Sequence, residues 1–148
     1  MDNFDSELEQ RVWQRVRSEP PQQATTLQGL AAAEQNEAAV YLMLSRQMQG
    51  AEKNMLRKLF EQEKSHAAIL RGMHLAATGQ RTQTRTLPPE PQAPETALRK
   101  CYARKLKAVS EYESRINDKE YGAVFAQLLR QEREHCAIIL EVLGRGQW

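Results

Sequence analysis

Apolar residues recur along most of the chain every three or four positions, which is the period of a helix with one buried face. The stretches with this period are rich in Ala, Leu, Glu, Gln, Arg and Lys, and they contain few Gly or Pro residues. The pattern predicts a short helix at about 4–17, ended by Pro20 and Pro21, and four long helices at about 26–49, 52–77, 94–117 and 118–144. Pro94 suits the first turn of the third long helix, and Asn117 with Glu120 resembles a capping box for the fourth.

The links between these helices differ in length. Short links join the first and second long helices and the third and fourth, which favours two antiparallel hairpins. The link at about 78–94 is long, rich in Pro and without apolar periodicity, so it is predicted to be a crossover. We therefore expect an all-α, four-helix bundle over residues 26–148, preceded by an N-terminal helix and linker over residues 1–25.

The composition of the chain argues against several classes of protein but does not indicate a function. The 148 residues are enough for one domain with a core, and the net charge of +2 is too mild to indicate nucleic-acid binding. No run of 18 apolar residues is present, so no membrane span is expected. The acidic start of the chain is unlike a secretory signal, and Cys101 and Cys136 form no CxxC pair. These features predict a cytoplasmic protein with reduced thiols.

Two segments of the chain are near copies of each other. LFEQEKSHAAIL (59–70) and LLRQEREHCAII (128–139) share six of twelve positions, including the pairs Glu63/Glu132 and His66/His135. Two amphipathic helices that shared only an apolar pattern would match less often. The second and fourth long helices are therefore interpreted as an internal repeat.

The predicted buried faces of three helices are apolar at both ends and ionisable in the middle. Six groups fall on these faces: Glu34, Glu37, Glu63, His66, Glu132 and His135. Burying several carboxylates together is costly unless cations compensate their charge. Divalent metal ions do this, and Glu and His three positions apart on a helix can reach one ion. The pattern predicts a metal site.

This arrangement resembles the ferritin-like di-iron carboxylate proteins, most nearly rubrerythrin. The resemblance covers roughly residues 26–143 and rests on E-x6-Y in the first long helix and E-x-x-H in the second and fourth. It implies that Glu34, Glu63, His66, Glu132 and His135 bind metal, with Glu37 as an additional carboxylate. It also implies that Tyr41 and Tyr112 hydrogen-bond the ligand carboxylates.

The third long helix departs from this pattern. Seven residues before Tyr112, where the resemblance calls for a glutamate, the chain has Lys105. Three interpretations are open. In the first, Lys105 pairs with Glu63 or Glu132, and the site holds one metal or none. In the second, the helix is rotated or locally distorted, so that Glu111 or Glu113 enters the site and Lys105 extends to the surface. In the third, Glu37 supplies the missing ligand and two metals bind.

Two classes of function are compatible with the sequence. The resemblance implies an iron-binding protein, with manganese or zinc as alternatives, that reacts with O₂ or peroxide as an oxidoreductase or in iron handling. The four-cysteine iron module of rubrerythrins is lacking, so electrons would come from a separate donor. The other class is a metal-poor, four-helix scaffold that mediates protein association. A homodimer is expected by analogy, and neither nucleic acid nor a membrane is expected as a partner.

Overall fold

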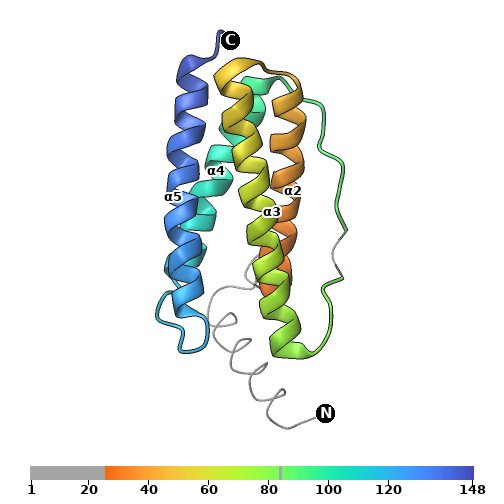
Figure 1. Ribbon diagram of the computed structural model, residues 1–148, viewed down its shortest axis with the longest axis vertical. Coiled ribbons are helices and arrows are strands. Elements are labelled where there is room, and N and C mark those ends of the chain that lie inside the picture. The colour runs from red at the N-terminus through yellow and green to blue at the C-terminus, as the bar shows by residue number, and fades with distance from the viewer. Residues whose placement is uncertain (1–25, 84) are drawn as a thin grey trace. The chain divides into compact units, whose positions relative to one another are not determined.

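The structure of the protein is a computed structural model, which describes residues 26–148 apart from residue 84. The helix predicted at about 4–17 lies outside the described residues. Within them the chain forms four helices and no strand: α2 (Leu27–Arg46), α3 (Gly50–Thr78), α4 (Pro94–Glu113) and α5 (Gly122–Arg145) (Figure 1). The predicted all-α class, a four-helix bundle, is confirmed. Among the helices that the structure describes, none has a stretch long and apolar enough to cross a bilayer.

The ends of the helices follow local sequence signals, with one exception. Gly79 directly follows α3 with a φ of 71°, which only glycine adopts without strain, and its N–H donates to the carbonyl of Leu75. Pro94 begins α4, as predicted. The predicted capping box before α5 is wrong. The side chain of Asp118 instead accepts the backbone N–H of Glu120 at 2.8 Å, and α5 begins only at Gly122.

The described chain divides into two compact units, and the boundary between them crosses α2 and α3. The first unit contains residues 26–39 and 60–88 of the described chain. Its buried apolar side chains come from α2 and α3: Leu27, Leu30, Ala31, Ala38, Ala67, Leu70, Met73 and Ala77. Removing these side chains from water is the main source of stability for this unit.

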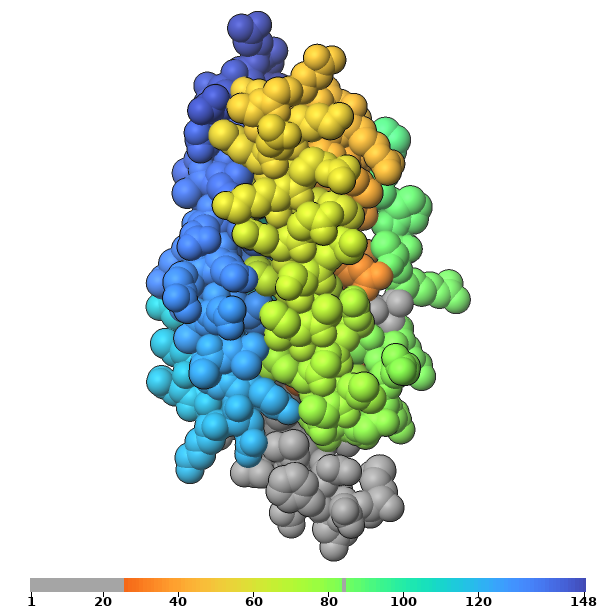
Figure 2. All heavy atoms as spheres, viewed as in Figure 1, coloured from red at the N-terminus to blue at the C-terminus, as the bar shows by residue number. Residues whose placement is uncertain are grey.

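A non-helical strap, which we define as residues 79–88 apart from residue 84, belongs to the first unit. Three polar side chains of α2 hold it. Gln28 accepts the backbone N–H of Gln83 at 3.1 Å, Asn36 accepts that of Leu87 at 3.2 Å, and the amide of Gln35 donates to the hydroxyl of Thr86. Gln35 and Asn36 follow Gln28 by seven and eight positions, which is about two helical turns, so the three side chains share one face of α2. Side chains of the strap form part of the surface beside α3 (Figure 2).

The second unit contains Val40–Leu59 and Pro89–Trp148. Within it α4 and α5 pack against each other (Figure 1). The core includes Leu98, Cys101 and Tyr112 of α4 with Phe125, Leu128, Ile139 and Val142 of α5. The rings of Tyr112 and Phe125 lie 6.0 Å apart between centroids, within the range of favourable aromatic pairs. This packing fixes the faces of α4 and α5 that carry Lys105 and Glu132.

Candidate metal centre

The ionisable residues of α3 lie on its buried face. The exposed fraction is 0% for Glu63 and 1% for His66. Their spacing of three residues puts both side chains on the same side of the helix. The sequence predicted that Glu63 and His66 lie on the buried face of this helix, and this prediction is confirmed.

A carboxylate of α2 lies against the histidine of α3. Oε2 of Glu34 is 3.5 Å from Nδ1 of His66, and both side chains are buried. One turn later on α2, Glu37 is also buried, with an exposed fraction of 5%. The first unit thus buries the carboxylates of Glu34, Glu37 and Glu63 with the imidazole of His66. A carboxylate beside one ring nitrogen of a histidine is the usual way to orient the other nitrogen toward a metal.

The corresponding residues of the second unit include a cation. Nζ of Lys105 on α4 lies 2.7 Å from Oε2 of Glu132 on α5, and the exposed fraction of both side chains is 0%. Nδ1 of His135 is 3.9 Å from the same carboxylate oxygen. At 2.7 Å the ammonium of Lys105 and the carboxylate of Glu132 form a short ion pair. The negative charge of Glu132 is therefore balanced by the ammonium of Lys105.

Of the three interpretations of Lys105, the one that turned it to the surface is wrong. Lys105 is completely buried. Glu111 instead pairs at 2.9 Å with Arg115, which lies four residues later and just beyond α4. Glu113 is largely exposed and lies 3.5 Å from Arg133. The charge of Lys105 is balanced inside the second unit by Glu132, so this side chain does not need the surface to solvate its charge.

Four of the six predicted ligands form one close group. Glu63, His66, Glu132 and His135 are all buried, and each offers a ligand atom within 4.8 Å of the others. Glu34 and Glu37 are buried as predicted, but neither belongs to this group. Their role as ligands stays a prediction. Tyr41 and Tyr112 are also completely buried, and their predicted role in orienting carboxylates is likewise untested.

The donor set of this group suits a divalent transition metal. Two carboxylates and two imidazoles provide hard oxygen and borderline nitrogen ligands, which bind iron, manganese and zinc. Buried carboxylates close together repel each other, and a cation between them removes that repulsion. The chemistry of the residues present therefore fits a metal ion.

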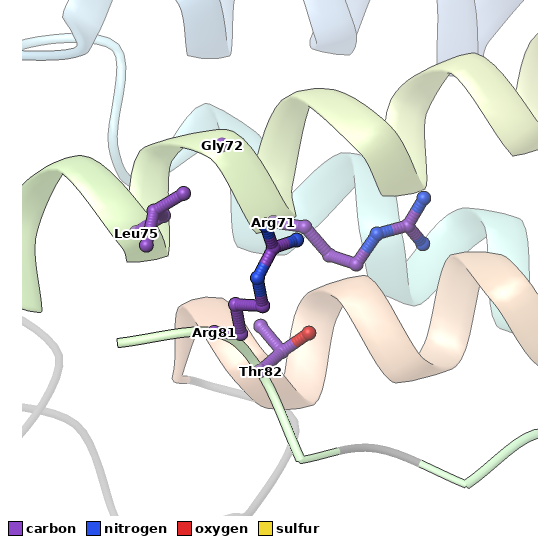
Figure 3. Close-up of a pocket in the computed structure, with 5 residues that line it drawn as sticks. All are labelled: Arg71, Gly72, Leu75, Arg81 and Thr82. Carbon is purple, nitrogen blue, oxygen red and sulfur yellow. The ribbon is translucent and has the colours of Figure 1, made fainter. Parts of the chain in front are cut away.

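The protein also has a surface pocket that the sequence did not predict. It has a volume of about 330 Å³ and lies between α3 and the strap, lined by Arg71, Gly72, Leu75, Arg81 and Thr82 (Figure 3). Nη1 of Arg71 donates to Oε1 of Gln35 at 3.3 Å, so the glutamine that holds the strap also fixes this arginine. None of the predicted metal ligands lines the pocket. An arginine that lines a pocket looks the same in the sequence as an arginine in open solvent, so the sequence contained no signal for this pocket.

Comparison with known proteins gives no match: no protein-family model, no curated protein and no solved structure matches this chain. The similarity to ferritin-like proteins is therefore carried by the residue pattern alone. The case for a metal centre depends on the burial, spacing and chemistry of the four grouped residues.

Proposed function

We propose that this protein binds a divalent transition-metal ion through Glu63, His66, Glu132 and His135. The observation that carries the proposal is the close grouping of these four buried residues, with ligand atoms within 4.8 Å of one another. Acidic and imidazole side chains seldom gather in a dry interior unless a cation compensates them. The internal repeat supports the same conclusion, because both copies of E-x-x-H contribute to the group.

We further propose that the metal is iron or manganese and that the protein is an oxidoreductase or iron-handling protein that reacts with O₂ or peroxide. Oxygen-rich ligation with two imidazoles favours these metals, while zinc also fits. When bound, such a metal supplies electron transfer to an oxygen substrate. The chain's own residues would hold the ion, exclude water and fix the charge beside it. Electrons would come from a separate donor protein.

Each residue of the centre has a distinct part in this proposal. Glu63 and Glu132 provide the negative charge that attracts the ion, and His66 and His135 complete its coordination. Glu34 lies against Nδ1 of His66 and would hold the orientation of that ring. Location in the cytoplasm belongs to the same proposal. A homodimer is proposed by analogy with ferritin-like bundles.

Metal binding is tested by loading the metal-free protein with Fe²⁺ under argon, and separately with Mn²⁺ and Zn²⁺, and measuring the retained metal by mass spectrometry. The wild type is expected to retain metal. Glu63→Gln and His135→Gln are expected to weaken the affinity by at least tenfold. Glu61→Gln is a matched control, since Glu61 is an exposed carboxylate two residues away on the same helix. Its affinity should equal that of the wild type.

The proposed chemistry has its own test. Admitting O₂ or peroxide to the Fe²⁺-loaded protein should consume the oxidant, which an oxygen electrode or a peroxide assay follows. The Glu63→Gln protein should consume little. If the protein binds metal tightly but consumes neither O₂ nor peroxide, the proposed metal binding stands and the proposed redox function is excluded.

One observation favours a second candidate function, a metal-poor scaffold for protein association. The ammonium of Lys105 already balances the charge of Glu132, so this carboxylate is stable without a metal. A folded wild-type protein that retained none of the three metals would favour the scaffold and rule out the metal centre.

A further inference from the structure

We infer that the centre holds one metal ion per chain rather than two, because the ammonium of Lys105 takes the place of the second. This inference rests on the proposed metal-binding function and adds its stoichiometry. Three features of the buried residues carry it: the contact of Lys105, the oxygen of Glu132 that the contact uses, and the spacing of the grouped ligands.

The first feature is the position of Lys105 among the buried charges. Its Nζ lies 2.7 Å from Oε2 of Glu132, and Oε2 is the same atom that lies 3.9 Å from Nδ1 of His135. A metal bound by Oε2 would sit about 2.1 Å from that oxygen. It would then be a near neighbour of the ammonium, and two cations at such a distance in a dry interior repel each other strongly. Lys105 and a metal therefore compete for this side of Glu132.

The second feature is the number of oxygens that Glu132 can offer. A carboxylate that bridges two metals uses one oxygen for each of them. Since Oε2 of Glu132 holds the ammonium of Lys105, a metal bound by Glu132 would take Oε1. Glu132 then acts as a ligand of one ion, and Lys105 fixes the direction in which its carboxylate points. Displacing the ammonium from a completely buried position would leave a buried charge without its carboxylate, which is costly.

The third feature is the spacing of the ligand atoms. Two atoms that bind the same ion, each about 2.1 Å from it, are at most about 4.2 Å apart. In a centre with two metals separated by about 3.5–4 Å, ligand atoms at its two ends are up to about 8 Å apart. The four grouped residues offer atoms within 4.8 Å of one another. This spacing is slightly above the limit for a single ion and well below the span of a centre with two metals.

The experiment measures the number of bound ions in wild type, Lys105→Glu and Lys105→Met proteins by equilibrium dialysis against Mn²⁺, followed by metal analysis. Electron paramagnetic resonance of the same samples distinguishes an isolated Mn²⁺ ion from a coupled pair. We expect one isolated ion in the wild type and a coupled pair in Lys105→Glu, because the new carboxylate replaces the ammonium. Lys107→Glu is the matched control, since Lys107 is exposed on the same helix and the change of charge is identical.

Each outcome has a definite meaning. Two ions in the wild type would overturn the inference and leave the proposed function standing. One ion in both the wild type and Lys105→Glu would show that Lys105 does not set the number, and would also overturn it. No ion in any folded variant would remove the proposed function, and the inference with it. If circular dichroism shows that Lys105→Glu does not fold, the Lys105→Met protein provides the test instead. Because this variant lacks the ammonium, we expect it to bind a second ion at high Mn²⁺ concentration, and a single ion would overturn the inference.

Discussion

Oε2 of Glu34 lies 3.5 Å from Nδ1 of His66, and both side chains are almost entirely inaccessible to water. A carboxylate in this position favours the ring orientation in which the other nitrogen binds a metal, and it raises the basicity of that nitrogen. Removing it should therefore weaken metal binding even though Glu63, His66, Glu132 and His135 are intact.

We predict that Glu34→Ala lowers the metal affinity by about 10–100-fold, the usual effect of losing a group that orients a metal-binding histidine. Competition with a chelator of known affinity measures the change. Glu34→Gln should have a smaller effect, since glutamine keeps the size of the side chain and an oxygen beside the ring. An unchanged affinity in Glu34→Ala would mean that this carboxylate neither binds the metal nor supports a ligand.

The buried pair of Lys105 and Glu132 predicts a non-additive effect on stability. Glu132→Leu alone should lower the free energy of unfolding of the metal-free protein by about 3–5 kcal/mol, because it leaves the buried ammonium without the carboxylate at 2.7 Å. The double variant Lys105→Met/Glu132→Leu should recover most of this loss, because a buried apolar pair does not need desolvated charges. Urea unfolding of both single variants and the double variant gives the coupling energy, and simple additivity would contradict the prediction.

Gly122 begins α5 in a place where no side chain fits. A Cβ at this position would lie 2.5 Å from the backbone carbonyl oxygen of Ile116. Gly122→Ala should therefore lower the free energy of unfolding by about 1–3 kcal/mol, since the turn before α5 must shift. Gly144→Ala is the control, because its Cβ would meet no atom within 4 Å and alanine favours the helix by up to about 1 kcal/mol. Equal stabilities of the two variants in urea would contradict this packing.

The strap predicts a local effect that global unfolding would not reveal. Replacing Gln28, Gln35 and Asn36 together by alanine removes the three hydrogen bonds to the strap, each worth about 0.5–1.5 kcal/mol. Trypsin should then cleave after Arg81 or Arg85 at least tenfold faster, since the strap opens more often. Gln127→Ala, at an exposed position of α5, should leave the cleavage rate unchanged. No acceleration in the triple variant would mean that these bonds do not hold the strap.

Tyr121 should make stability fall at high pH. Burial raises the pKa of its hydroxyl above the ordinary value of 10.0, and the carboxylates of Glu120 and Asp118 raise it further. Between pH 10 and the raised pKa, the unfolded chain has lost this proton and the folded chain keeps it, so the free energy of unfolding falls as the pH rises. Below pH 10 the contribution is fully present. Tyr121→Phe should flatten this alkaline slope in urea unfolding measured from pH 9 upward, and an unchanged slope would exclude Tyr121 as its source.

Much of the burial pattern was predictable from the sequence. Within one helix the period of 3.6 residues fixes which side chains share a face, so an apolar stripe predicts the buried side. In α3 the apolar residues Leu56, Leu59, Leu70 and Met73 follow this period and are buried, and so are Glu63 and His66 between them. The prediction loses accuracy at helix ends. Tyr121 is only partly buried, because the chain before α5 forms turns held by Asp118 rather than the predicted helix.

The sequence by itself determined that the chain is helical, which faces of the helices are buried, and that carboxylates and imidazoles lie among those buried residues. Local periodicity suffices for this, because it depends only on neighbours in the same helix. Only the tertiary structure decided that Lys105 is buried, that its partner is Glu132, and that Glu111 and Glu113 remain with arginines outside the core. Contacts between helices depend on the rotation and axial offset of each helix, which the packing of the whole core sets and no single periodic stripe encodes.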